Sequence, residues 1–196
     1  MAAAGDTLEE PVSGLRIVFR KTARDTAGEL LQLDIFFRPG GFVAGEHVHP
    51  RQEERFQVIA GAPWFRIAGR RDRLGPGEAT TAAPGVRHTW GNDGDDELHA
   101  VVEFRPALDT EGFFEDLCAL SADGELDRKG RPRPLQLAAM LHEYREEVAL
   151  PWLPLPLQRA LVGAVARLAR RRGYRGRYAV RSGDVSTAED RGSTDV

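Results

Sequence analysis

The chain has 196 residues, 41% of them hydrophobic, which suits one well-buried domain with an extension rather than two full domains. Its 27 basic and 30 acidic residues leave a net charge of -3, which excludes a general electrostatic attraction to nucleic acid or to a membrane surface. The single cysteine, Cys118, excludes an intrachain disulfide framework, and we interpret it as a small apolar residue within a helix.

The N-terminal segment, residues 1–13, is small and acidic in character. It lacks the basic residues and the apolar run of a secretory signal, so we predict a cytoplasmic protein. It also has too few apolar side chains to offset the entropy of ordering, and we predict that it is disordered. No segment predicts a membrane span, because the most apolar stretch, residues 148–169, is interrupted by three prolines and two arginines.

Residues 14–106 consist of short apolar segments separated by clusters of Gly, Pro, Asn and Asp. This pattern is typical of β-strands joined by tight turns. Eight strands at this spacing predict an all-β sandwich or barrel, in which each sheet edge is paired or closed. The predicted strands cover residues 15–19, 30–37, 42–49, 54–60, 64–68, 78–83, 87–90 and 98–104.

After Pro106 the apolar residues recur every three or four positions, which predicts a helical extension over residues 107–181. Its first helix follows a cap at Asp109 or Thr110, and its second begins at Pro134. The third, residues 156–173, ends at a glycine. The final residues, 182–196, are small, polar and charged, and we predict that they are disordered.

The third predicted helix has two distinct faces. One face carries apolar residues from Leu157 to Leu168, and the opposite face carries arginines. The eight arginines and no acidic residue between Arg159 and Arg181 raise the alternatives of a nucleic-acid or an anionic-lipid patch. We favour a helix whose apolar face packs on the barrel or on a second subunit. We predict a homodimer and no binding of nucleic acid. A peripheral membrane contact through residues 156–173 stays open.

Two histidines one residue apart point to a metal site. Alternate side chains of a strand share a face, so His47 and His49 project together. A hairpin after Pro50 can return Glu54 beside them, whereas Glu53 faces outward. A third imidazole becomes available later in the chain, at His88. Three imidazole nitrogens and one carboxylate suit Fe, Mn, Co, Ni, Cu or Zn better than Ca or Mg.

These residues recur in two segments that resemble the paired motifs of the cupin superfamily, in particular the small bacterial single-domain cupins of the cupin-2 type. The matching positions of the two motifs are Gly41, His47, His49, Glu54, Gly61, Gly77, Gly85, His88 and Asn92. The proline expected in the second motif is Ala83, with Pro84 one position later. The resemblance implies a jelly-roll barrel that holds a metal ion through His47, His49, Glu54 and His88.

Other residues of the barrel have two interpretations. The side chains that share the ligand face, Phe56, Val58 and Trp90, either line the metal cavity or form plain core. On the same argument Arg87 and Gln57 point outward. We predict structural roles for the two remaining histidines, which are His99 and His142.

The resemblance implies a metal-dependent cupin enzyme that acts on a small organic molecule. A divalent ion with one carboxylate keeps a surplus positive charge, which favours an anionic substrate. We predict an oxidoreductase of the dioxygenase type with Fe(II) as the favoured metal and Mn, Ni, Zn, Co or Cu as alternatives. A second hypothesis is a non-oxidative isomerase or cyclase of small-molecule metabolism in which Glu54 or a nearby group moves a proton. A third is a cupin that binds a small ligand without turnover.

Overall fold

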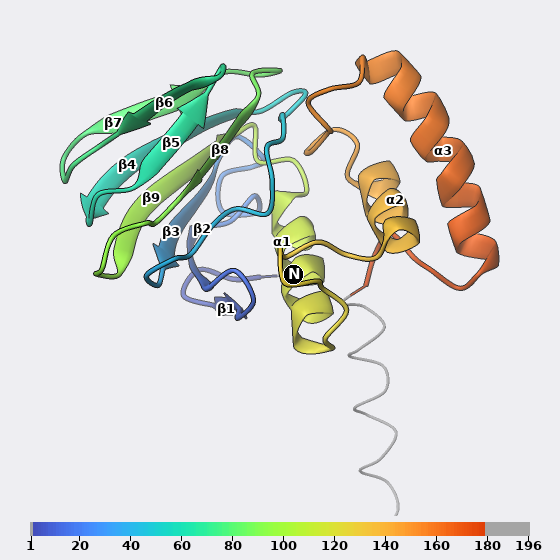
Figure 1. Ribbon diagram of the computed structural model, residues 1–196, viewed down its shortest axis with the longest axis horizontal. Helices are drawn as coiled ribbons and strands as arrows, with labels where there is room; N and C mark the ends of the chain where they lie inside the picture. The colour runs from blue at the N-terminus through green and yellow to red at the C-terminus, as the bar shows by residue number, and fades with distance from the viewer. Residues whose placement is uncertain (1, 179–196) are drawn as a thin grey trace, which may run out of the picture.

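The computed structural model describes residues 2–178. Two antiparallel sheets form a jelly-roll barrel, and three helices follow it on one side (Figure 1). The predicted disordered tail, residues 182–196, lies outside the described residues, as do the last three residues of the predicted helical extension. The prediction of an all-β barrel with a C-terminal helical extension is confirmed.

The larger sheet has six strands in the order β1-β2-β3-β9-β4-β7, and the smaller has three in the order β6-β5-β8. The strands of the larger sheet are β1 (Thr7–Glu10), β2 (Leu15–Lys21), β3 (Leu31–Phe37), β9 (Leu98–Arg105), β4 (Glu53–Ala60) and β7 (Ala79–Ala82). Those of the smaller sheet are β6 (Arg70–Arg73), β5 (Trp64–Ile67) and β8 (His88–Gly91).

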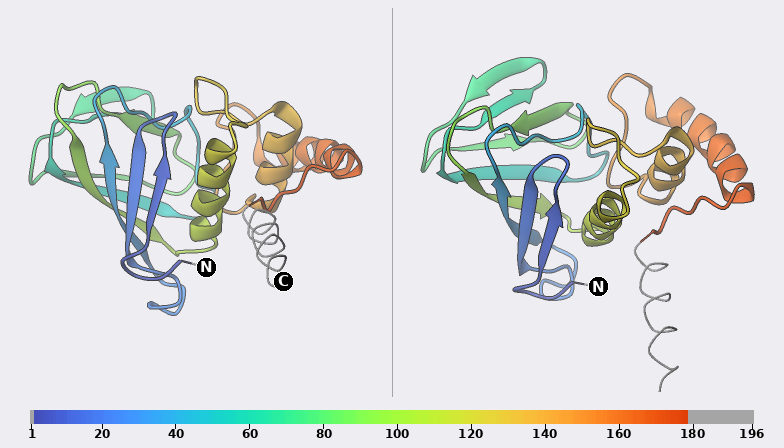
Figure 2. Two further views of the ribbon diagram at one scale, coloured as in Figure 1. Left: turned by 90° about the horizontal axis from the view of Figure 1, so that it is seen from below. Right: turned by 60° about the horizontal axis from the view of Figure 1, so that its bottom comes forward.

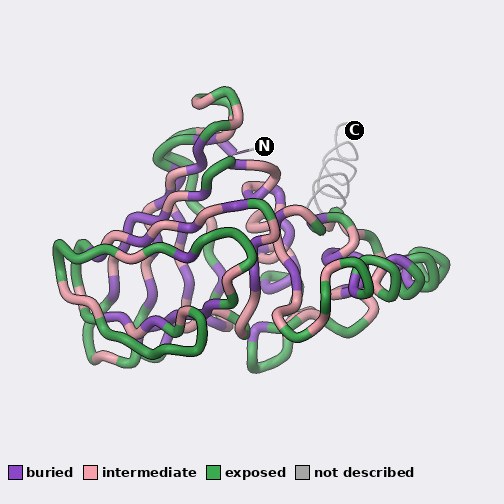
Figure 3. Tube along the Cα trace, turned by 90° about the horizontal axis from the view of Figure 1, so that it is seen from above, coloured by how far each residue is buried: buried purple, intermediate pink, exposed green. Residues whose placement is uncertain are grey.

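The barrel core follows from strict alternation along the central strands. In β3 every second residue from Leu31 to Phe37 is buried, and in β4 the same holds from Glu54 to Val58. Figure 3 shows this alternation as buried segments that interrupt the more exposed ones along the barrel. Burial of one face of each sheet fixes the register, because a shift by one residue would turn the whole apolar set outward.

The predicted strand at residues 42–49 is not a regular strand. It forms only isolated bridges, through Phe42, His47 and Val48. Gly45 has a φ of 98°, a left-handed conformation that breaks the extended backbone just before the two histidines. The side chains before and after Gly45 therefore do not follow simple alternation. Elsewhere, β6 pairs with β5 and is a strand that was not predicted from the sequence.

The prediction of disorder for residues 1–13 is wrong over residues 2–13. β1 pairs with β2, and the buried Glu10 accepts hydrogen bonds from the backbone N–H groups of Val12 and Ser13, both at 2.8 Å. Its carboxylate also accepts a hydrogen bond from the Ser121 hydroxyl of the first helix. Main-chain pairing and one buried carboxylate thus order a segment with few apolar side chains.

The three helices are α1 (Thr110–Ala122), α2 (Pro134–Glu143) and α3 (Leu155–Arg171). α1 lies against the barrel, α2 lies beyond α1, and α3 is the outermost helix (Figure 2). Asp109 precedes α1 as its N-cap residue but forms no side-chain cap hydrogen bond. Cys118 is buried in α1 as predicted, and burial raises the pKa of its thiol to about 12.

The apolar face of α3 does not pack on the barrel, contrary to one of the two predicted arrangements. Leu157, Leu161, Val165 and Leu168 remain 50%, 50%, 41% and 44% exposed. The helix instead turns a face with small residues toward α2, where Gly163, Ala166 and Ala169 are buried. Small side chains let the two helix axes approach closely, so the larger apolar residues stay at the surface.

Within residues 2–178 no helix combines the length and the apolar composition that a membrane span requires. The cytoplasmic location stays a prediction from the sequence.

Candidate metal centre

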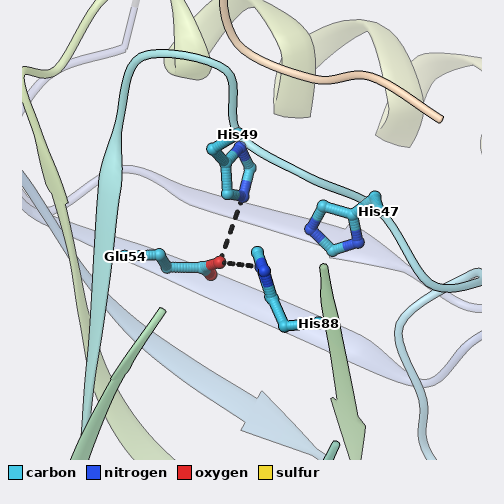
Figure 4. Close-up of side chains that lie close together, drawn as sticks. All are labelled: His47, His49, Glu54 and His88. Carbon is cyan, nitrogen blue, oxygen red and sulfur yellow. Dashed lines mark hydrogen bonds and ion pairs between the residues drawn. The ribbon is translucent and has the colours of Figure 1, made fainter. Parts of the chain in front are cut away.

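Three separate segments bring the predicted metal ligands together. His47 lies on the segment before the β4 hairpin and forms two backbone hydrogen bonds with His88 at the start of β8, at 3.0 and 2.9 Å. His49 follows two residues later, and Glu54 is the second residue of β4. Figure 4 shows the four side chains pointing toward one another inside the barrel. One potential ligand atom from each lies within 4.8 Å of the others.

The Glu54 carboxylate is the centre of this cluster. Its Oε2 lies 2.7 Å from His88 Nε2 and 3.1 Å from His49 Nε2 (Figure 4). The residue is only 4% exposed. A buried carboxylate is stable only where donors or cations compensate for lost hydration, and here two imidazoles provide that compensation.

In each of the three histidines, Nδ1 faces a backbone carbonyl. Nδ1 of His49 donates to the Glu147 carbonyl at 2.5 Å, and Nδ1 of His88 donates to the Val86 carbonyl at 2.9 Å. Nδ1 of His47 faces the Gly45 carbonyl at 3.3 Å. A carbonyl oxygen only accepts, so Nδ1 carries a hydrogen. Nε2 is the atom left to bind a metal ion, once it gives up the proton that His49 and His88 donate to Glu54. The backbone thereby selects the tautomer that a metal site needs.

The pKa values of the cluster reflect burial and mutual charge. Burial opposes ionisation of Glu54, but hydrogen bonds from His49 and His88 outweigh it and hold the carboxyl pKa well below its usual range. Burial, helped by the neighbouring His49 and His88, lowers the pKa of His47 to about 3. Burial also acts against protonation of His88, yet its hydrogen bond to Glu54 raises the pKa. Glu54 is thus ionised, His47 is neutral, and His88 readily holds a proton.

The donor set fits a divalent transition metal. Neutral imidazole nitrogens and one carboxylate suit Fe, Mn, Co, Ni, Cu or Zn, whereas Ca and Mg prefer oxygen ligands. Within the described residues Glu54 has no lysine or arginine partner, so its negative charge is compensated by imidazoles alone. A cation placed among the four ligand atoms would provide the missing positive charge.

The cluster borders a cavity of about 390 Å³ between the barrel and the helices. His47, His49 and Glu54 belong to its wall. Most of the remaining wall is apolar and comes from β2, β3, α1, α2 and the segment after α2. The principal apolar residues are Leu15, Ile35, Phe37, Phe42, Val43, Trp90, Phe104, Phe113, Phe114, Leu117, Leu137, Met140, Leu141, Val148, Leu150 and Trp152.

The helical extension takes part in the site, which the sequence analysis did not anticipate. Besides the Glu147 carbonyl that holds His49, Ala149 and Val48 exchange two backbone hydrogen bonds of 2.9 and 3.0 Å. These contacts join positions about a hundred residues apart, and no local pattern in the sequence signals them. The extension therefore fixes the orientation of one potential metal ligand.

Gln52, in the hairpin between His49 and Glu54, is a second residue that the sequence analysis missed. Its side-chain N–H₂ group lies 2.9 and 3.0 Å from the carbonyls of Pro106 and Ala107 and 2.7 Å from the Thr110 hydroxyl. These acceptors lie at the start of α1. Gln52 thus ties the ligand hairpin to the first helix of the extension.

The remaining predicted residues divide between wall and core. Trp90 lines the cavity, whereas Phe56 and Val58 are fully buried in the barrel core. His99 has the predicted structural role, because its Nε2 pairs with Asp34 at 2.7 Å and its ring stacks on Phe36.

His142, Arg87 and Gln57 were also predicted to lie away from the metal cluster. His142 lies outside the cluster, on α2, where its ring faces Gly163 of α3. Arg87 is exposed and Gln57 is half-buried, in keeping with their predicted outward direction.

Comparison with known proteins identifies the central domain. Residues 34–104 match the family model described as "Cupin domain". Similar solved structures include KdgF from Halomonas sp. (23% identity, 54% of this chain and 92% of that chain, TM-score 0.47). A predicted oxalate decarboxylase from Thermotoga maritima gives 18% identity, 47% and 80% coverage and a TM-score of 0.45. A sugar phosphate isomerase from Silicibacter pomeroyi is 18% identical, with 48% of this chain and 60% of that chain covered and a TM-score of 0.43. No curated protein matches the chain.

Replacing His49 by alanine removes one imidazole from the cluster and leaves the Glu147 carbonyl without its donor. We expect the affinity for Zn to fall by about 100-fold or more, because loss of a ligand costs at least as much as loss of its hydrogen-bond partner. The measurement is metal content by mass spectrometry after reconstitution with Fe, Mn, Ni, Cu and Zn in turn. Glu53→Gln is the matched control and should bind as wild type. Equal metal in wild type and His49→Ala would contradict the assignment.

Metal affinity should fall on acidification, with the slope determined by His88. Its pKa is raised by Glu54, so below that pKa a bound metal must displace a proton, which costs about tenfold in affinity per pH unit. His47, with a pKa of about 3, remains neutral and adds no slope in this range. Competition with a chromophoric chelator for Zn between about pH 8 and about pH 5.5 measures the effect. A flat profile would show that no proton is displaced.

Proposed function

Residues 34–104 form a cupin domain, and from this premise we propose that the protein is a metal-dependent enzyme acting on a small organic molecule. In this proposal His47, His49, Glu54 and His88 bind the metal ion. The observation that carries the proposal is the position of the cluster in the wall of a largely apolar cavity. Such an arrangement gives a metal ion and an organic ligand adjoining places.

We propose Fe(II) as the metal, with Mn, Ni, Zn, Co or Cu as alternatives. Three imidazoles and one carboxylate would hold such an ion and would leave it open to ligands from the cavity. A bound ion would provide Lewis acidity there and, in the case of iron, electron transfer. The proposed reaction class is therefore an O₂-dependent oxidation of the dioxygenase type.

The protein side chains contribute orientation, charge and exclusion of water. The backbone carbonyls behind His47, His49 and His88 fix the imidazole planes. Glu54, proposed as the catalytic residue, is ionised, the form that accepts a proton. Its lowered pKa makes it a weak base, so a bound metal ion would have to acidify the ligand first. The apolar wall keeps bulk water away from the reacting atoms, which strengthens electrostatic interactions inside the cavity.

A divalent ion and the Glu54 carboxylate together carry a formal charge of about +1. This surplus supports a substrate that presents a carboxylate, enolate or catecholate group to the cluster. The same residues would also suit a non-oxidative isomerase or cyclase, or a protein that binds its ligand without turnover.

Oxygen consumption distinguishes these reactions. We expect Fe(II)-loaded protein to consume O₂ in the presence of an aromatic or keto-acid substrate at least about tenfold faster than the His49→Ala variant. Glu53→Gln should match the wild type, and Zn-loaded protein should consume none. An oxygen electrode and chromatography of the products give the measurement. Conversion without O₂, or saturable binding without product, would replace the dioxygenase proposal by the isomerase or by the binding protein.

We further propose a homodimer that pairs through the exposed apolar face of α3. Leu157, Leu161, Ala164 and Leu168 follow one another at intervals of four, three and four residues, the spacing of a coiled-coil seam. Trp152, 69% exposed, precedes this helix in the chain. Exposed apolar residues gathered in one place are typical of an interaction surface.

Replacing both Leu161 and Leu168 by glutamate should convert the dimer into a monomer, because each charge would be buried in the seam. Light scattering coupled to size-exclusion chromatography measures the mass. Ile59→Glu is the control, since Ile59 is similarly exposed, at 43%, but lies on the barrel. A monomeric wild type would refute the proposed homodimer.

A further inference from the structure

We propose that the substrate enters the cavity as an uncharged, largely apolar molecule with a hydroxyl or similar hydrogen-bond donor, and that Glu46 accepts this donor. The inference rests on the proposed function but replaces the anionic substrate considered there by one that enters uncharged. It assigns a specificity role to a residue that the two sequence motifs do not include.

Glu46 forms part of the cavity wall next to the metal cluster. Its Oε1 atom is shielded from solvent and has no hydrogen-bond partner among the described residues. Buried polar atoms in native proteins are nearly always paired, and each exception requires an explanation. A ligand bound in the cavity that Glu46 borders supplies a donor once the carboxylate turns toward it.

The other carboxylates of the wall are already engaged. Glu10 accepts hydrogen bonds from two backbone N–H groups and a serine hydroxyl. Glu54 is held by His49 and His88, and Glu147 accepts the backbone N–H of Asp109 at 3.1 Å. Glu46 is thus the wall carboxylate to which the described residues supply no hydrogen-bond donor.

The charge of the whole wall opposes an anionic ligand. It contains four carboxyl groups, Glu10, Glu46, Glu54 and Glu147, and one guanidinium, Arg131. At formal charges of -4 and +1, a divalent ion of about +2 leaves about -1. Arg131 is also committed to Asp127, at 2.7 and 3.0 Å. The surplus positive charge of the four ligands and their metal is therefore reversed by the surrounding wall.

The apolar side chains of the cavity wall favour a ligand whose larger part is apolar. Aromatic and aliphatic side chains from both the barrel and the helices surround the cavity, and its volume of about 390 Å³ falls within the range of small-molecule sites. Charges interact strongly in such an apolar setting. An uncharged enol, phenol or alcohol enters at lower cost than a carboxylate of the same size.

Three naphthalene derivatives separate charge, donor and apolar body. The probes are 1-naphthol, 1-naphthoate and 1-methylnaphthalene, titrated into zinc-loaded protein and followed by tryptophan fluorescence. We expect 1-naphthol to bind at least about tenfold more tightly than 1-naphthoate. Glu46→Leu should weaken the binding of 1-naphthol by about tenfold and should change the affinity for 1-methylnaphthalene by less than about threefold.

Glu46→Gln tests charge separately from hydrogen bonding. Its amide oxygen still accepts a hydrogen bond, so the affinity for 1-naphthol should stay within about threefold of wild type. The affinity for 1-naphthoate should rise by about fivefold or more. Glu29→Leu, an exposed residue outside the cavity wall, is the matched control and should change neither. Thermal unfolding followed by circular dichroism verifies that each variant is folded.

The outcomes separate this inference from the proposed function. If 1-naphthoate binds as tightly as 1-naphthol, if no probe saturates, or if neither Glu46 variant alters the pattern, the inference is overturned. The same titrations on metal-free protein, together with measured metal content, test the cavity independently of the metal. Preserved preference for 1-naphthol in a chain that takes up no metal would support the inference while refuting the metal-dependent enzyme.

Discussion

The arrangement of the site depends on one constraint, the burial of an ionised carboxylate without a lysine or arginine beside it among the described residues. Glu54 points into the barrel, where an unpaired charge would be highly unfavourable. His49 and His88 must therefore lie within hydrogen-bonding distance, which fixes how the β4 hairpin and the start of β8 approach each other. The same convergence that stabilises the charge creates a set of ligand atoms around one point.

The helical extension is part of this arrangement rather than an appendage to the barrel. The Glu147 carbonyl holds His49, and Ala149 pairs with Val48, so the ligand segment is bound by chain that follows α2. α1 and α2 also supply much of the apolar wall. Separating the extension from the barrel would remove a hydrogen bond behind a potential ligand and open the cavity to water. Site and extension are consequently coupled through main-chain contacts.

Much of the barrel can be predicted from local alternation, and the four-residue cluster from the spacing within two separate motifs. Alternation marks β3 and β4, and the intervals between His47, His49 and Glu54 place them around one hairpin. What fails depends on distant contacts or on backbone conformation. The left-handed Gly45 breaks the expected strand, and the partner of His49 is about a hundred residues away. The ordering of β1 requires a neighbouring strand, which its own composition does not reveal.

The electrostatic character of the cavity illustrates the same distinction between local and distant residues. The four clustered side chains together with a divalent ion would suggest a site that attracts anions, and their spacing makes this visible in the sequence. Glu10 and Glu147 join the wall from outside the two motifs, and Glu46 joins it although its parity with Val48 would turn it away from the histidines. Ligand atoms determine which ion can bind, whereas the assembled wall determines which organic molecule can approach it. A barrel with unchanged metal ligands can therefore favour a different substrate through its wall alone.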